Sequence, residues 1–190
     1  ISRADIERSQ AFDLPALLRN VTGMEVAQNG GPGTLASVFI RGAESRHTLV
    51  LIDGVPVNNL NFSLAALEHL PLSNVERIEV VRGNVSSLYG SAALGGVIQI
   101  FTRDAGAQPY ASLKLQAGSR GLAQLQAGAG MKTAGGTGLS FSADGLNDGG
   151  FNGIDQVKRP GTNPDTDSYN RRAFSFGLAQ DIAIGKLSLK

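Results

Sequence analysis

Aspartates gather in one stretch of the second half of this 190-residue chain. Residues 145–170 contain or adjoin five of them: Asp144, Asp148, Asp155, Asp165 and Asp167. Hard divalent cations such as Ca²⁺ take about six to eight oxygen ligands, and carboxylates are prominent among them. The spacing differs from that of an EF-hand loop, and Lys158 and Arg159 lie in the same stretch. The stretch therefore indicates either a divalent-cation site or an acidic loop in water.

Two arginines occupy similar positions in the first half of the chain. Arg41 and Arg82 each end an apolar run directly before a glycine. A guanidinium group stays charged in a half-buried setting and pairs well with carboxylates. From the residues alone, the simplest interpretation is a pair of solvated arginines at strand ends, each near a carboxylate such as Glu76 or Glu79.

The chain lacks the residue sets of the common enzyme classes. It has no cysteine, which excludes thiol catalysis, thiolate zinc sites and disulfides. His47 and His69 have no second ligand at metal-binding spacing, and no Gly-x-Ser-x-Gly motif is present. The glycine-rich run at residues 30–33 is not followed by the Gly-Lys-Ser/Thr of a phosphate-binding loop. We therefore expect no enzyme and no catalytic cofactor.

The composition narrows the range of partners. Lys and Arg number 17 and Asp and Glu 16, which leaves a net charge of +1. So balanced a chain is not typical of proteins that bind nucleic acid. Hydrophobic residues make up 42 %, enough for a core, but no apolar run reaches the length of about 18 residues that a membrane-spanning helix needs.

The distribution of charge divides the chain at residue 109. Residues 1–109 contain eight arginines and no lysine, whereas residues 110–190 contain five lysines and no glutamate. Pro109 follows a short flexible run of small residues at the point of change. We therefore predict one domain at residues 1–109 and another at residues 110–190.

The first domain mixes helical and extended patterns. Asp13 is a suitable N-cap and Gly23 a suitable stop for a helix whose apolar residues follow helical spacing: Leu14, Leu17, Leu18 and Val21. Short β-type runs separated by glycines follow at residues 24–27, 37–41, 48–53, 78–82 and 97–102. Residues 64–70 and 72–76 predict short helical turns. The pattern indicates a small α+β domain.

The second domain repeats a period of two. Apolar and polar residues alternate at residues 111–117, 123–129, 139–144, 174–179 and 186–190. Short connections at residues 118–121, 133–137 and 183–185 contrast with a long one at residues 145–170. The pattern predicts an antiparallel meander, either in a soluble sandwich with a wet face or in a membrane barrel with lipid outside and a polar interior.

The longest specific motif is VRGNVSSLYGSAALGGVIQI, at residues 81–100. It resembles the plug-domain signature of TonB-dependent outer-membrane receptors. Three other segments resemble further plug motifs in the order of that family: DLPALL at residues 13–18, VFIRG at 38–42 and LVLIDGVPV at 49–57. The resemblance covers residues 1–104, and the strands that follow resemble the start of the family's barrel.

The resemblance implies an α+β plug domain followed by antiparallel transmembrane β-barrel strands. The family's barrel has about 22 strands, whereas residues 110–190 offer about five, since each spanning strand takes about 9 to 11 residues. They form an incomplete barrel that cannot close a pore. The family's topology would place the long connection outside the cell and the short turns at residues 133–137 and 183–185 in the periplasm.

The resemblance also implies roles for single residues. Arg41 and Arg82 match a pair that docks the plug to glutamates of the barrel wall. Residues 28–35 and 58–63 match apical loops that touch the substrate, which makes these residues candidates: Gln28, Asn29, Thr34, Leu35, Asn58, Asn59, Leu60, Asn61 and Phe62. Residues 163–169 resemble the aspartate-rich hairpin of the cobalamin branch of the family, which implies a structural calcium bound by the aspartates.

The function implied is TonB-dependent uptake of cobalamin across the bacterial outer membrane, with the plug as the gate. The partners would be outer-membrane lipid and TonB, whose recognition box would lie before Ile1. A ferric-siderophore or haem receptor of the same architecture matches the plug motifs equally, although the acidic hairpin and the two loops favour cobalamin. From another class, a periplasmic binding or signalling module remains open.

Overall fold

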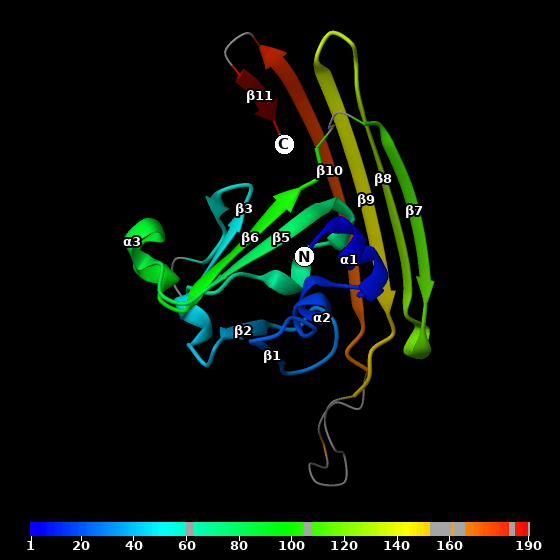
Figure 1. Ribbon diagram of the computed structural model, residues 1–190. Coiled ribbons are helices and arrows are strands. Elements are labelled where there is room, and N and C mark those ends of the chain that lie inside the picture. The colour runs from blue at the N-terminus through cyan, green and yellow to red at the C-terminus, as the bar shows by residue number, and fades with distance from the viewer. Residues whose placement is uncertain (60–62, 105–107, 153–160, 162–165, 183–184, 190) are drawn as a thin grey trace. The chain divides into compact units, whose positions relative to one another are not determined.

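The computed structural model describes residues 1–59, 63–104, 108–152, 161, 166–182 and 185–189 (Figure 1). The chain splits into two compact units, one of Ile1–Asn29 and Gly33–Thr102 and the other of Gly30–Pro32 and Arg103–Lys190. The main change of unit falls between Thr102 and Arg103, a few residues before the boundary predicted at residue 109.

The first unit begins with two short helices, α1 (Arg3–Ser9) and α2 (Leu14–Leu18). Asp13 caps α2 as predicted, since its Oδ1 accepts a hydrogen bond of 2.7 Å from the amide of Ala16. Helix α1 was not predicted, although Ser2 and Asp5 form a capping box at its start. None of the helices among the described residues is long and apolar enough to cross a membrane.

The first unit is built on a four-stranded sheet of order β4-β3-β6-β5. Its strands are β3 (Thr48–Ile52), β4 (Val55–Pro56), β5 (Val75–Arg82) and β6 (Gly96–Thr102). Strand β6 pairs in parallel with β3 and antiparallel with β5. Ile1 extends this sheet locally: its main-chain nitrogen donates to the Ile78 carbonyl at 2.8 Å, and the Ile78 amide donates to the Ile1 carbonyl at 2.9 Å.

A two-stranded ribbon, β1 (Met24–Gln28) and β2 (Ala36–Ile40), completes the strands of this unit. Short helical segments fill the connections: η1 (Ser45–His47), η2 (Leu67–His69), η3 (Leu72–Asn74), α3 (Ser86–Tyr89) and η4 (Ser91–Ala93). The segments η2 and η3 confirm the helical turns predicted at residues 64–70 and 72–76. One hydrophobic cluster joins the helices to the strands, with these residues at its centre: Leu14, Leu18, Ile40, Ile78 and Ile98.

Gly96, in the long sequence motif, permits the close packing of β5 and β6. Its φ is +154°, and a Cβ on it would lie 2.4 Å from the carbonyl oxygen of Val81. Because that distance is far below a van der Waals contact, any side chain here would push the two strands apart. The spacing of β5 and β6 therefore requires a glycine at position 96 of the motif.

The second unit is a five-stranded antiparallel sheet in chain order (Figure 1). Its strands are β7 (Tyr110–Ala117), β8 (Ala123–Lys132), β9 (Thr137–Asp148), β10 (Tyr169–Ile182) and β11 (Gly185–Leu189), with η5 (Ser119–Gly121) between β7 and β8. This order confirms the predicted meander. Since β8, β9 and β10 have 10, 12 and 14 residues, each is long enough to cross a membrane.

The two faces of this sheet differ in chemistry as the alternation predicted. One face is apolar and exposed, with exposed fractions of its large side chains from 39 % for Leu139 to 75 % for Phe174, and includes Leu113, Leu115, Leu125 and Phe176. The other carries buried polar residues: Gln124, Gln126, Ser140, Ser142 and Asp144. In a soluble sheet the apolar face is the buried one, so this arrangement favours the membrane barrel over the sandwich.

The predicted long connection at residues 145–170 was wrong at both ends. Strand β9 continues to Asp148 and β10 begins at Tyr169, where these two residues pair with each other. The alternation also continues, because Leu146 and Asp148 are buried on the same face as Asp144. The connection is therefore residues 149–168, and Asp144 and Asp148 belong to a strand.

Candidate functional site

The two arginines that were expected to dock the plug lie beside the same glycine. Arg41 follows β2, and its amide donates to the carbonyl oxygen of Gly23 at 3.1 Å. Arg82 ends β5, and its Cδ and Nε lie 3.8 Å from the position that a Cβ on Gly23 would take. Two strand ends far apart in the sequence thus meet at Gly23, and both arginines are exposed.

Neither Arg41 nor Arg82 forms an ion pair with another residue that the structure describes. Glu79, an alternative partner suggested by the sequence, pairs instead with Arg77 at 2.7 Å. Exposed guanidinium groups that pair with no described carboxylate are suited to bind acidic side chains from another segment.

The loop at residues 28–35 is held by the side chain of Gln28. Its Oε1 accepts a hydrogen bond of 2.8 Å from Nη2 of Arg19, and its Nε2 donates to the carbonyl of Thr34 at 3.1 Å. Gln28 therefore fixes the loop, whereas Asn29 and Leu35 are exposed. Of the four candidates here, these two present the most surface to a ligand.

The loop at residues 58–63 is anchored by Asn58. Its Oδ1 accepts from the amide of Val50 at 2.7 Å, and its Nδ2 donates to the carbonyls of Thr48 at 3.0 Å and Ser63 at 2.9 Å. Asn59 is exposed. The other candidates of this loop, Leu60, Asn61 and Phe62, lie outside the described residues.

The five candidate aspartates are not brought together in the described part of the chain. Asp144 and Asp148 lie on one face of β9, four residues and about 14 Å apart along the strand. Oδ1 of Asp148 accepts from the amide of Gly150 at 2.6 Å, and Asp167 is exposed. Asp155 and Asp165 fall outside the described residues. Among the described residues, no three acidic or histidine side chains lie close enough together to bind a metal ion. The cation site stays a prediction.

Asp144 instead forms the centre of a buried polar network that the sequence analysis missed. Its Oδ1 accepts from Nε and Nη2 of Arg171 at 3.1 and 2.9 Å. Its Oδ2 accepts from Nε2 of Gln124 at 3.0 Å and of Gln126 at 2.8 Å. The side chains of Asp144 and Arg171 are 0 % and 6 % exposed, and the network joins β8, β9 and β10. It holds the register of three strands.

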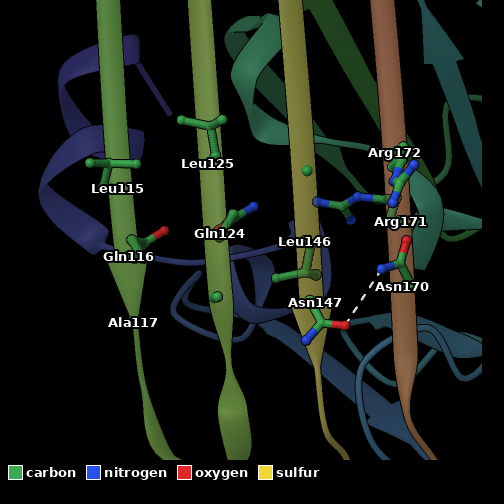
Figure 2. A pocket seen from close by; sticks show the side chains of 12 residues that line it. Leu115, Gln116, Ala117, Gln124, Leu125, Leu146, Asn147, Asn170, Arg171 and Arg172 are labelled. Carbon is green, nitrogen blue, oxygen red and sulfur yellow. Dashed lines mark hydrogen bonds between the residues drawn. The ribbon is translucent and has the colours of Figure 1, made fainter.

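A hollow of about 500 Å³ opens on the same sheet, across β7 to β10 (Figure 2). Leu115 and Leu125 lie at one side of it, and Arg172 lies on β10. Asn170 Nδ2 donates to Asn147 Oδ1 at 3.5 Å nearer the strand ends. The lining thus changes from apolar to cationic across the strands, and from apolar to amide groups along them.

Sequence comparison identifies relatives of known type. The family model for the TonB-dependent Receptor Plug Domain matches residues 1–97. The vitamin B12 transporter BtuB of Vibrio cholerae serotype O1 is 44 % identical over 131 residues, which cover 69 % of this chain and 21 % of that protein. The chain thus spans about a fifth of the length of the relatives that it matches.

Structural comparison gives the same architecture. The pyoverdine outer membrane receptor FpvA from Pseudomonas aeruginosa PAO1 superposes with a TM-score of 0.76 at 17 % identity, covering 99 % of this chain and 26 % of that one. The siderophore receptor PirA from Acinetobacter baumannii superposes with a TM-score of 0.73 at 21 % identity, covering 96 % and 29 %. At these identities the likeness shows the fold.

The family model covers more than half of the chain and contains most of the motif at residues 81–100. The α+β unit and the antiparallel sheet together superpose on the solved receptors over 96 to 99 % of this chain. The resemblance found in the sequence is confirmed, and the chain belongs to the TonB-dependent receptors, with their plug domain as its first part.

Proposed function

We propose that this chain is part of a receptor that takes up cobalamin across the outer membrane with energy from TonB. The observation that carries the proposal is the 44 % identity over 131 residues with a vitamin B12 transporter. Because the chain spans 21 % of that relative, the activity is one of a complete receptor. This chain contributes the plug and the first strands of its barrel.

The chain is located in the bacterial outer membrane, as are the receptors of its family. Such receptors are transporters, and we infer that this one works without catalysis. In the proposed mechanism, the plug closes the barrel until substrate has bound outside and TonB acts on a segment before Ile1. The gate is then the sheet of the first unit, and the transported molecule leaves chemically unchanged.

The substrate contacts would come from the exposed parts of the two plug loops. Asn29, Leu35 and Asn59 combine amide groups with apolar surface, which suits a bulky ligand that carries amides of its own. Gln28 and Asn58 would act indirectly, since their amides already hold the loops in place. The two loops would thus form a pre-shaped floor for the substrate.

We further propose a structural calcium in the long connection at residues 149–168. Asp144 already accepts four hydrogen bonds, so its carboxylate is poorly placed to bind a cation. The proposed ligands are therefore drawn from Asp148, Asp155, Asp165 and Asp167, together with main-chain oxygens. Calcium bound there would order the connection for substrate binding.

One titration tests the substrate and the metal together. Cobalamin is added to the full-length receptor in detergent, first with calcium and then with a chelator, and binding is followed by the absorbance of the corrin. We expect saturable binding that weakens in chelator. An Asp165→Asn/Asp167→Asn double variant should bind as weakly in calcium as the unchanged receptor does in chelator.

The outcomes separate the alternatives. A folded receptor that binds no cobalamin in either condition would exclude the substrate and favour a ferric chelate, which agrees with structural neighbours that are siderophore receptors. Cobalamin binding that is equal with calcium and chelator would leave the substrate in place and exclude the metal. A reading frame that lacks the remaining barrel strands would favour the periplasmic module.

A further inference from the structure

The hollow on the exposed apolar face of the second unit has a positively charged side chain at one end. Three residues share a row across the strands at its apolar side, since Leu115 pairs with Leu125 and Leu125 with Gly145. The same row ends at Arg172, which pairs with Gly145. An exposed cation therefore stands in line with two exposed leucines on a mainly apolar face (Figure 2).

Small residues make the hollow. A Cβ on Gly145 would have no heavy atom within 4 Å, so the surface above this glycine is open. In the next row, Ala117 pairs with Ala123 and Ala123 with Asn147. The result is a floor of small side chains that is bordered by leucines and leads to the amides of Asn147 and Asn170.

Arg172 has no ion pair within the part of the chain that the structure describes, in contrast to its neighbour Arg171, which pairs with Asp144. A lipid-facing cation destabilises a barrel strongly at the midplane of the bilayer and only weakly near its surface. Arg172 lies near the strand ends that lead to residues 118–122 and 149–168. A charged group of lipid is the partner available at that depth.

We propose that this hollow binds one phosphorylated, acylated glycolipid of the outer leaflet, with its phosphate on Arg172 and an acyl chain that lies over Gly145 and against Leu125 and Leu115. Charge complementarity selects an anionic headgroup, and the asparagine amides supply hydrogen-bond donors for sugar or phosphate oxygens. The leaflet follows from the loops: the long connection at residues 149–168 lies at this end, and long loops of outer-membrane barrels face outside. The inference rests on the outer-membrane location and is independent of the transported substrate.

The test uses native mass spectrometry of the full-length receptor in detergent with purified lipid A as the probe. The Arg172→Gln variant should bind lipid A about fivefold more weakly, as expected for one cation near a charged membrane surface. A Gly145→Leu variant, which fills the hollow, should also weaken binding while keeping Arg172. The matched control is Lys132→Gln, a cation at the other end of the sheet that pairs with Asp181 at 2.6 Å and should bind lipid A as before.

Three results would overturn the proposal. Binding unchanged in both Arg172→Gln and Gly145→Leu would show that lipid A does not use the hollow. An equal loss in Lys132→Gln would show a general effect of charge. Equal Arg172-dependent binding of phosphatidylglycerol would exclude the assignment to a glycolipid. Since Arg172→Gln should leave cobalamin binding unchanged, failure here is distinguishable from failure of the proposed transport function.

Discussion

The amide of Asn58 makes three hydrogen bonds to the main chain of its own unit, with Thr48, Val50 and Ser63. A sequence shows an asparagine in a polar loop, and both substrate contact and loop anchoring need the same residue type. Geometry separates them, because an amide whose donors and acceptor are already used has little left for a ligand. The position of Asn58 in a loop was predictable; its anchoring role was not.

Replacing Asn58 by alanine should loosen the loop without unfolding the plug. The amide of Val50 would lose its acceptor, at a cost of about 1–2 kcal/mol, and its hydrogen exchange should speed up about fivefold or more. The measurement is amide exchange in the full-length receptor. Asn58→Asp keeps an acceptor for Val50, so its exchange rate should lie between those of the unchanged receptor and the alanine variant. Unchanged exchange in the alanine variant would contradict an anchoring role.

Asp5 makes the start of α1 sensitive to acid. Hydrogen bonds from the side chain and amide of Ser2, and then the contact with Arg8, lower the pKa of Asp5 from 3.8 to about 2. A lowered pKa means that the carboxylate stabilises the folded helix above pH 3.8 and that this contribution is lost as the pH falls toward 2.

Amide exchange in α1, corrected for the intrinsic rate, should therefore accelerate between pH 4 and about pH 2. In Asp5→Asn the helix should be weaker at neutral pH and should change little over that range. An equal acid response in both proteins would assign the response to another group.

At the scale of strands, alternation predicted which residues share a face but not how neighbouring strands align. Gln124, Gln126 and Asp144 could be placed at polar positions from the sequence alone. Their convergence on one carboxylate depends on the register of β8, β9 and β10, which many long-range pairings set together. For the same reason, the sequence prediction ended β9 too early and began β10 too late.

The network around Asp144 offers a test of what fixes that register. Arg171→Met leaves a buried carboxylate without its cation and should destabilise the full-length receptor by about 3 kcal/mol or more. The double variant Asp144→Leu/Arg171→Met removes both charges and should lose less stability than the two single variants together. Chemical unfolding of the unchanged receptor, Asp144→Leu, Arg171→Met and the double variant measures the coupling. Additive effects would contradict an interaction between the two charges.

At the scale of the molecule, the change from an α+β pattern to a strict period of two predicted both parts and their order. The parallel pairing of β3 with β6 was not predicted, since these strands are separated by β4, β5 and several short helices. The family motif carried information that local propensity lacks. It could not supply side-chain contacts, such as the approach of Arg41 and Arg82 to Gly23.

Arg41 and Arg82, which form no ion pair among the described residues, lead to a prediction for the complete receptor. If they bind glutamates of the barrel wall, the double variant Arg41→Gln/Arg82→Gln should hold the plug less firmly and let through solutes that the closed barrel excludes. Uptake of a bulky antibiotic by cells that produce the variant measures the leak, and we expect it to rise. Arg46→Gln, whose arginine pairs with Glu44 at 2.6 Å, is the control and should not leak. Equal uptake in all three strains would exclude docking by these arginines.

The pairing of Ile1 with Ile78 determines how a mechanical load would enter the plug. Two hydrogen bonds connect Ile1 sideways to the middle of β5, which is the edge strand beside β6. If TonB pulls on a segment ahead of Ile1, as proposed, the load would reach these two bonds first. Since each contributes only about 1 kcal/mol, they would part under a small force, and the first step of extension would leave the sheet of the plug whole.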